Sequence, residues 1–458
     1  MDRAGGMSGA TGRRWLKAPL AVLADEAGGG LVVEAGRIAE LVPTGQSPAG
    51  PVDELVDMSR HVVVPGLINT HHHFYQTLTR AFPPALNREL FPWLTALYPV
   101  WARMAPEDLA LGMRVALAEL MLSGCTTTTD HHYVFPRGCA AGIDIEVAEA
   151  RALGMRGVFT RGSMNLSQKD GGLPPDSVVQ DEDEILADSE RLLSTYHESG
   201  PLAQIQIALA PCSPFSVTRS LMAASADLAR RHGARLHTHL AETRDEDAWC
   251  AETFGMRPLD YLDACGWLGP DVWLAHGIHF SDADMARLAK AGTAVTHCPC
   301  SNMIIHSGHC RVCELEAAGV TVGLGVDGSA AQDSSNLMQE VRQAFLLQRH
   351  HYGVSAVSHL DALRWATEGS AACIGREDLG RIAVGMAADL ACFTLEDLRF
   401  SGHGDPIAAL VNCGAHHADR VMIAGRWTVW DGAIPGLDLA ALRLDHQAAA
   451  RRVQALTQ

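Results

Sequence analysis

The hydrophobic pattern beyond residue 60 alternates between helical stretches and short extended runs. One helical stretch, PEDLALGMRVALAELMLSG, has Pro106 at its start, apolar residues near helical spacing and Gly124 at its end. The run CTTTTDHH follows it directly, and the same order recurs as far as VTVGLGVDGS. Together with the run before Asn69, this gives eight predicted strands, and the alternation indicates βα units with a parallel sheet.

Eight such units fit a closed barrel better than an open sheet. A doubly wound sheet is expected to carry a Gly-rich phosphate loop after an early strand, and the sequence has none. Both chain ends instead show short β patterns, such as GGLVVEAGRIAELV and GRIAVGMAADLACF. We therefore predict an α/β fold with a (β/α)8 TIM-type barrel over residues 63–378. Residues 1–62 and 379–458 are predicted to form a small β-sandwich domain, the latter with a terminal helix.

The segment 163–182 is polar, rich in Gly and Pro, and long for a βα loop. Long loops of this kind are often functional, so it is a candidate lid.

Composition excludes several classes of protein. The formal charge of −17, without a basic cluster, argues against binding to nucleic acid or to an anionic membrane. No apolar run approaches the roughly 18–20 residues of a membrane span. The twelve cysteines lack regular spacing, and the early apolar run LAVLA is too short for a signal peptide. We expect reduced thiols and a cytoplasmic protein.

Three consecutive histidines follow the first predicted barrel strand, in NTHHHFYQTLTR. Residues two apart in an extended chain face the same side. His71 and His73 are therefore expected to point into the barrel, and His72 toward the surrounding helices in a structural role. A single His-x-His pair is more often structural than metal-binding, so the pair alone does not establish a metal site.

Later strand ends add further candidates. LHTHLAE places His239 and Glu242 after the fifth strand, WLAHGIHF places His276 after the sixth, and GLGVDGS places Asp327 after the eighth. Barrel strand ends gather on the face where active sites are built. Three imidazoles and a carboxylate suit Zn²⁺ or a similar ion, which lowers the pKa of bound water to about 7. Glu242 is placed to transfer protons; the alternative is a solvated carboxylate at a helix start.

A separate stretch, rich in cysteine and histidine, offers an alternative metal site: a structural zinc site. CxC and CxxC pairs bind zinc elsewhere. The residues concerned are Cys298, Cys300, His306, His309, Cys310 and Cys313. The other zinc deaminase pattern, H-x-E with P-C-x-x-C, is absent from the sequence.

The motifs PGLINTHHH, HTHLAE, AHGIHF, PCSNMIIHSG and GLGVDGS together resemble the amidohydrolase superfamily, in its cytosine, guanine and S-adenosylhomocysteine deaminase branch. The resemblance covers essentially the whole chain. It implies one divalent metal, Zn²⁺ or alternatively Fe²⁺ or Mn²⁺, on His71, His73, His239 and Asp327. Many relatives bridge two metals with a lysine after the fourth strand, but QIQIALAPCSPF contains none, so we expect one ion.

The resemblance also implies hydrolytic deamination of a heteroaromatic ring. Asp327 would take a proton from the attacking water, Glu242 would protonate a ring nitrogen, and His276 would stabilise the developing oxygen. The region from NTHHHFYQTLTRA to SGCTTTTDHHYVFP is most similar to 8-oxoguanine deaminases, which turn 8-oxoguanine into urate and ammonia.

Five residues are predicted to contact the substrate. Gln76 has an amide that matches a purine or pterin edge. Cys212 lies where guanine deaminases carry an Arg-Phe pair, which argues against ordinary guanine deamination. Trp101, His132 and Tyr133 are expected in the pocket; for Trp101 and Tyr133 the alternative is plain packing.

Three other functions stay open. An isoxanthopterin or other pterin deaminase is the main alternative, and an aminohydrolase of substituted triazines is another. A non-catalytic barrel scaffold is a third, although the intact set of ligands argues against it. We expect a small-molecule, purine-like substrate and a homodimer, without nucleic-acid or membrane partners.

Overall fold

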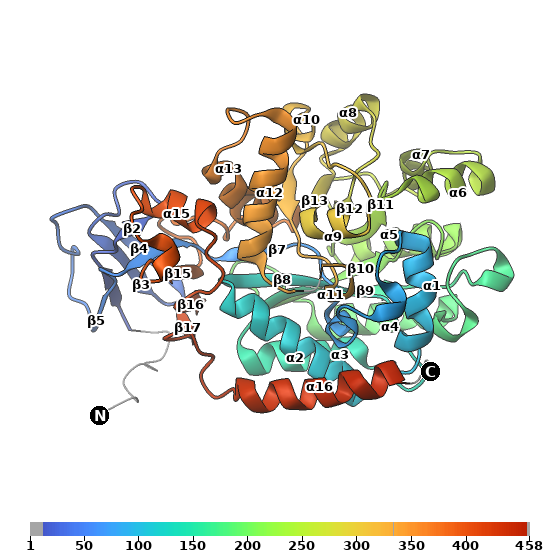
Figure 1. Cartoon of the computed structure of the whole chain (residues 1–458), viewed down its shortest axis with the longest axis horizontal. Coiled ribbons are helices and arrows are strands. Elements are labelled where there is room, and N and C mark those ends of the chain that lie inside the picture. Colours follow the sequence, from blue (N-terminus) through green and yellow to red (C-terminus); the bar gives the residue numbers. More distant parts are fainter. Residues whose placement is uncertain (1–11, 333, 456–458) are drawn as a thin grey trace.

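The structure is a computed structural model, and residues 12–332 and 334–455 are described (Figure 1). Its centre is a sheet of eight parallel strands that follow one another in chain order. The Thr70 N–H donates to the Leu324 carbonyl (3.1 Å), which brings the first strand next to the last and nearly closes the barrel. The strands are β7 (Leu67–Asn69), β8 (Cys125–His132), β9 (Arg156–Ser163), β10 (Ile205–Pro211), β11 (Leu236–Leu240), β12 (Val272–His276), β13 (Ala294–His297) and β14 (Val322–Leu324).

Helices connect and surround these strands. The second helix begins at Pro106 and ends just before Gly124, whose φ of 96° suits a glycine that ends a helix. The α-helices of the barrel region are α1 (Leu90–Trp101), α2 (Pro106–Leu122), α3 (Gly142–Leu153), α4 (Glu182–Tyr196), α5 (Arg219–Arg231), α6 (Arg244–Phe254), α7 (Pro258–Ala264), α8 (Asp282–Ala291), α9 (Pro299–Ile304), α10 (Val312–Ala317), α11 (Ser329–Gln332), α12 (Leu337–Tyr352), α13 (His359–Arg364) and α14 (Ser370–Cys373). Short helical turns are η1 (Phe74–Thr79), η2 (Pro83–Ala85), η3 (Gln168–Asp170), η4 (Asp176–Val178), η5 (Trp365–Gly369) and η6 (Leu398–Phe400).

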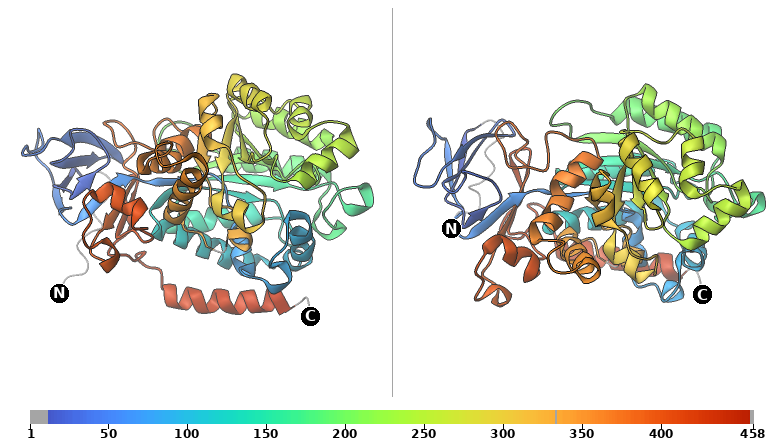
Figure 2. Two further views of the ribbon diagram at one scale, coloured as in Figure 1. Left: turned by 45° about the horizontal axis from the view of Figure 1, so that its top comes forward. Right: turned by 90° about the horizontal axis from the view of Figure 1, so that it is seen from above.

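Two further sheets lie at one end of the molecule (Figure 2). One has the order β4-β3-β1-β5, and the other has the order β17-β16-β15-β6-β2, so the second contains strands from both ends of the chain. The two sheets share an apolar core that includes Leu16, Leu31, Leu390 and Met422. Their strands are β1 (Arg14–Lys17), β2 (Ala21–Val22), β3 (Gly30–Glu34), β4 (Arg37–Val42), β5 (Glu54–Asp57), β6 (His61–Pro65), β15 (Leu390–Thr394), β16 (Arg420–Ile423) and β17 (Arg426–Val429). Helix α15 (Pro406–Asn412) lies between β15 and β16 in the chain.

The last helix, α16 (Leu439–Ala455), returns from the β-sheets and runs along α2 (Figure 1). Arg452 forms an ion pair with Asp108 of α2. The side-chain amide of Gln454 donates to the Leu78 carbonyl (2.7 Å), and His446 Nε2 lies 3.1 Å from Thr77 Oγ1. The C-terminal helix therefore holds η1, which carries Gln76, from the outside.

The barrel with additional β-sheets confirms the predicted fold class. The limits at residues 62 and 378 stay a prediction; strand β6 spans the first of them. Among the described residues, no helix combines the length and apolar character needed to cross a bilayer. All twelve cysteines lie in the described part of the chain and are free.

Candidate metal centre and active site

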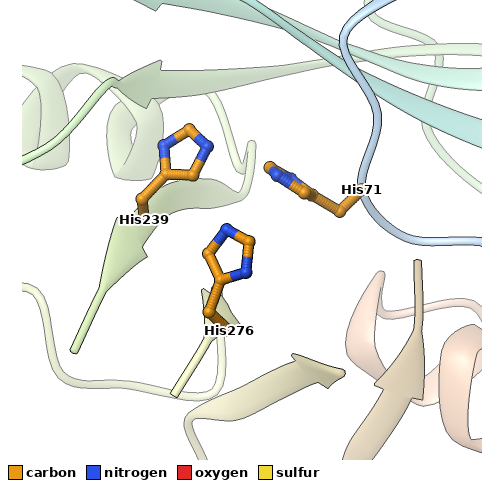
Figure 3. Close-up of side chains that lie close together, drawn as sticks. All are labelled: His71, His239 and His276. Atoms are coloured by element: carbon orange, nitrogen blue, oxygen red, sulfur yellow. The ribbon is translucent and has the colours of Figure 1, made fainter. Parts of the chain in front are cut away.

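The histidines and acidic residues expected at the strand ends converge on one side of the barrel. His71 and His73 follow β7, His239 lies in β11, His276 ends β12 and Asp327 follows β14. Figure 3 shows the rings of His71, His239 and His276 pointing toward one another from three separate segments. Although β7 ends at Asn69, the His-x-His spacing still brings His71 and His73 together, with ring centroids 4.8 Å apart.

The spacing of the ligand atoms suits one small metal ion. Nε2 of His71 and Nε2 of His73 each lie 3.3 Å from Asp327 Oδ1, and Nε2 of His73 lies 3.2 Å from Nε2 of His239. Tetrahedral zinc with bonds of about 2.0–2.1 Å separates its ligand atoms by about 3.3–3.4 Å. Three interatomic distances within the predicted ligand set therefore match such a site.

The other ring nitrogen of each histidine is already hydrogen-bonded. His73 Nδ1 donates to the His131 carbonyl (2.7 Å), and His239 Nδ1 donates to the Cys212 carbonyl (2.7 Å). His71 Nδ1 lies 2.8 Å from His237 Nε2. A neutral imidazole with its proton on Nδ1 has a lone pair on Nε2. Three lone pairs and a carboxylate thus face one another, which is the chemistry of a cation site.

Burial keeps two of the proposed histidine ligands in the protonation state that binds metal. It lowers the pKa of His71 and of His239 well below the usual value, so their rings are neutral.

Asp327 is fixed by its own hydrogen bonds. Oδ2 accepts from the Ser301 hydroxyl (2.5 Å), and Oδ1 accepts from the Gly328 N–H (2.6 Å). The neighbouring glycine leaves room for the Gln76 side chain, because a Cβ at residue 328 would lie 1.9 Å from Gln76 Oε1. Asp327 has a φ of 66° and His276 one of 75°, conformations that non-glycine residues rarely adopt and that cluster at functional sites.

Glu242 and His276 lie beside these ligands. His276 Nε2 lies 3.7 Å from Glu242 Oε2 and 3.9 Å from Asp327 Oδ2. Its Nδ1 donates to Asn302 Oδ1 (3.0 Å), which orients the ring. Burial, aided by the charge of Asp327, raises the pKa of Glu242 well above its usual value. Glu242 is only 4% exposed, which rules out the alternative of a solvated carboxylate.

A narrow pocket opens onto this cluster. Of the predicted substrate contacts, Gln76, Cys212 and Tyr133 line it. Burial raises the pKa of the Cys212 thiol to about 12, so it is uncharged. Gln76 Nε2 has no hydrogen-bond partner among the described residues and is available to a ligand.

Two predicted contacts lie behind the pocket lining instead. Trp101 is fully buried, donates to Thr79 Oγ1 (3.1 Å) and packs against Trp93 and Tyr98, which do line the pocket. His132 packs against other aromatic rings, and burial lowers its pKa to about 3. Trp101 thus backs the pocket wall, whereas the ring partners of His132, Tyr75 and Phe135, do not line the pocket.

Helix α1 supplies a wall that the sequence reasoning missed. Leu90, Trp93, Leu94 and Tyr98 line the pocket, together with Ser213, Phe215 and Ile305. The first four recur at helical spacing, so the amphipathic pattern of LFPWLTALY was the signal available. None of residues 163–182, the candidate lid, lines this pocket.

His72 and the cysteines between residues 298 and 313 do not belong to the ligand cluster. His72 Nε2 lies 2.9 Å from Ser335 Oγ, away from His71 and His73. Four groups of described residues have three potential ligand atoms within 4.8 Å of one another, and none includes a cysteine. The alternative of a structural zinc site around Cys298 and Cys310 therefore has no support in the described part of the chain.

Comparisons with known proteins agree with this geometry. A model of the amidohydrolase family matches residues 62–428. The chain is 59% identical over 441 residues to 8-oxoguanine deaminase of Pseudomonas aeruginosa. The aligned region covers 96% of this chain and 98% of that protein. It is 35% identical to an isoxanthopterin deaminase of an unknown prokaryotic organism, over 86% of each chain. The crystal structure of atrazine chlorohydrolase from Arthrobacter aurescens TC1 complexed with zinc has a TM-score of 0.90 and 29% identity, over 95% of this chain and 100% of that one.

Proposed function

The chain belongs to the amidohydrolase family and is a hydrolytic deaminase, and we propose that it converts 8-oxoguanine and water to urate and ammonia. One observation carries the proposal: three of the four proposed ligands line a pocket together with Glu242 and His276, in a chain 59% identical to an 8-oxoguanine deaminase.

His71, His73, His239 and Asp327 would hold a divalent metal ion, which we propose to be Zn²⁺. When bound, the ion acts as a Lewis acid that makes water a stronger nucleophile at neutral pH. Nε2 of His71 is buried and has no hydrogen-bond partner among the described residues, which supports this assignment. Fe²⁺ and Mn²⁺ are the alternatives that metal analysis distinguishes.

The side chains around the reacting carbon would divide the proton transfers. Asp327 accepts a proton from the attacking water. Glu242 donates a proton to the ring nitrogen next to the carbon that bears the amino group, because its raised pKa favours the protonated carboxyl. His276, oriented by Asn302, stabilises the oxygen of the tetrahedral intermediate. The proton held by Asp327 then passes to the amino nitrogen, the carbon–nitrogen bond breaks and ammonia leaves, while the hydroxyl proton returns to Glu242 as the new carbonyl group forms.

The walls of the pocket suit a flat heteroaromatic ring. Trp93, Tyr98, Tyr133 and Phe215 supply aromatic surfaces. Gln76 Oε1 is 3.4 Å from the Ala330 N–H, and its Nε2 is free to donate to a ring carbonyl. This arrangement supports a purine substrate rich in carbonyl groups; the same features suit a pterin, which makes isoxanthopterin the second candidate.

Ammonia release from purified, metal-analysed enzyme tests the substrate. The panel contains 8-oxoguanine, guanine, isoguanine, isoxanthopterin, cytosine and a triazine. We expect 8-oxoguanine to exceed the others in kcat/KM by at least tenfold. A higher value for isoxanthopterin would support the second candidate, and no turnover of any compound by metal-loaded enzyme would contradict deamination of this class.

Glu242→Gln tests the proton transfer. General acid catalysis is worth about 10²–10⁴-fold, so kcat is expected to fall by that factor while bound metal is unchanged. Glu252→Gln, an exposed position on the helix that follows, is the matched control and is expected to retain full activity. Activity of the Glu242→Gln enzyme within tenfold of the parent would refute the assignment.

We also propose a homodimer located in the cytoplasm. The free thiols of all twelve cysteines support a reducing compartment. Light scattering coupled to size exclusion tests the dimer, and a monomeric mass would exclude it.

A further inference from the structure

Another buried histidine, His237, lies directly behind the proposed ligand His71. His237 precedes His239 by two residues in β11, so both side chains point into the barrel. His237 is fully buried, and its Nε2 lies 2.8 Å from His71 Nδ1. These two residues are 166 positions apart in the sequence, and no part of the reaction proposed above uses His237.

The directions of the hydrogen bonds around His237 follow from its other neighbour. His237 Nδ1 lies 2.8 Å from the Trp273 carbonyl, which can only accept, so Nδ1 carries the proton. In a neutral ring, Nε2 then has a lone pair and must accept from His71 Nδ1–H. His71 in turn is left with a lone pair on Nε2, the atom that faces Asp327.

The position of His237 is itself fixed. Its ring stacks on the Trp273 indole, with centroids 4.4 Å apart and an interplanar angle of 12°. The Trp273 indole N–H donates to the Thr70 carbonyl (3.0 Å), which precedes His71. The segment that carries His71 is thus joined to β11 through His237 and to β12 through Trp273.

His71 differs from the other proposed histidine ligands in the partner of its Nδ1 atom. His73 and His239 donate from Nδ1 to backbone carbonyls, whereas His71 depends on a side chain. His131 is the other nearby imidazole, but its ring is 5.9 Å from His71 and its Nε2 is bonded to the Ala210 carbonyl (2.8 Å). His71 is therefore the ligand whose orientation a substitution can change.

We propose that His237 is a positioning residue for the metal ion, and this proposal rests on the ligand set of the proposed function. By accepting a hydrogen bond from His71 Nδ1–H, His237 fixes the tautomer and ring orientation that present His71 Nε2 to the ion. Partners of this kind raise the basicity of a ligand and typically contribute 10–100-fold to metal affinity. His71, His131 and His237 also have potential ligand atoms within 4.8 Å of one another. A second ion there would require His71 Nδ1 to lose its proton, so the proposal predicts one ion per chain.

The matched variants His237→Gln and His237→Met separate this role from general packing. Both replacements remove Nδ1, the atom that donates to the Trp273 carbonyl, and the two side chains have nearly the same shape. The Gln amide oxygen replaces the Nε2 acceptor, whereas Met offers His71 no comparable acceptor. His237→Phe, which keeps a ring on Trp273, is the second variant if the Met protein does not fold. His297→Phe is the control, because His297 is equally buried in the barrel and makes no hydrogen bond to a proposed ligand.

Zinc affinity of the purified full-length chain is measured by competition with a chromogenic chelator, alongside metal stoichiometry and thermal unfolding. We expect the Met and Phe variants to bind zinc 10–100-fold more weakly, the Gln variant within threefold of the parent, and the control at parent affinity whatever its melting temperature. Excess zinc should restore deamination by the Met variant.

Parent affinity in the Met and Phe variants would overturn the role of His237 while leaving the proposed function intact. A Gln variant as weak as the Met variant would do the same, as would two ions per parent chain. A parent enzyme that binds no divalent metal would instead contradict the ligand set, and with it both proposals.

Discussion

The Glu246 carboxylate is hydrogen-bonded to the backbone at Glu242, the proposed general acid. Glu246 lies in the first turn of α6 and is 1% exposed. Its Oε1 accepts from the Ala241 N–H (3.0 Å), and its Oε2 accepts from the Glu242 N–H (2.8 Å). Ala241 has a φ of 53°, a conformation that costs free energy for an alanine. Replacing Glu246 by glutamine tests whether these two bonds keep Glu242 in place.

The expected loss follows from the hydrogen bonds. Glutamine has one amide oxygen and one NH₂ group, so one of the two backbone N–H groups loses its acceptor and faces a donor. A hydrogen bond to a charged group is worth about 1.5–3 kcal/mol, and each 1.4 kcal/mol is a factor of ten. If this free energy holds Glu242 in its active position, kcat should fall by about 10–100-fold.

The loss should also depend on pH. Burial raises the pKa of Glu246 to about 8, while the two backbone amides oppose the rise. Above that pH the carboxylate accepts both bonds, whereas below it a protonated carboxyl resembles the glutamine amide. The ratio of parent to variant kcat should therefore be largest at pH 9 and should shrink toward pH 6.5.

Ammonia release at both pH values, with metal content measured in the same samples, provides the assay. Glu252→Gln, an exposed position on the same helix, is the control. Parent kcat in the Glu246→Gln enzyme at pH 9 would refute the reasoning. A loss of metal with parent kcat per bound ion would show instead that Glu246 supports His239.

Two more substitutions probe the substrate pocket and the junction between barrel and β-sheets. Gln76→Leu removes the free amide donor of the pocket and is expected to raise KM for 8-oxoguanine by about tenfold, the equivalent of roughly one hydrogen bond, in initial-rate kinetics; an unchanged KM would exclude Gln76 from the subsite. Asp389→Asn breaks the buried pair between Asp389 and Arg156 of β9 (3.0 Å), a change that typically costs about 3–5 kcal/mol and should lower the urea midpoint of unfolding. Glu396→Gln, which removes an exposed ion pair with Arg60, should leave that midpoint unchanged; equal midpoints for the two variants would contradict the role of the buried pair.

The sequence by itself determined the fold class and the set of residues that meets at the strand ends. Alternation of helical and extended stretches depends only on local periodicity, so eight βα units were visible without a structure. The closure of a barrel then forces strand ends together, which is why His71, His239, His276 and Asp327 were identified although they come from distant segments. His71 and His73 still lie together although β7 ends at Asn69, with ring centroids 4.8 Å apart.

Tertiary structure alone decided what surrounds those residues. Trp101 and Tyr133 were equal candidates for the pocket, yet only Tyr133 lines it, because the packing of α1 places Trp93 and Tyr98 in front of Trp101. The partner of His71 Nδ1 comes from a strand 166 residues away. A hydrogen bond requires distance and direction to be right within fractions of an ångström, and local sequence patterns carry no such information across distant segments. Strand order can therefore be read from periodicity, whereas the tautomers, the pocket wall and the groups that hold Glu242 emerge only when the barrel is assembled.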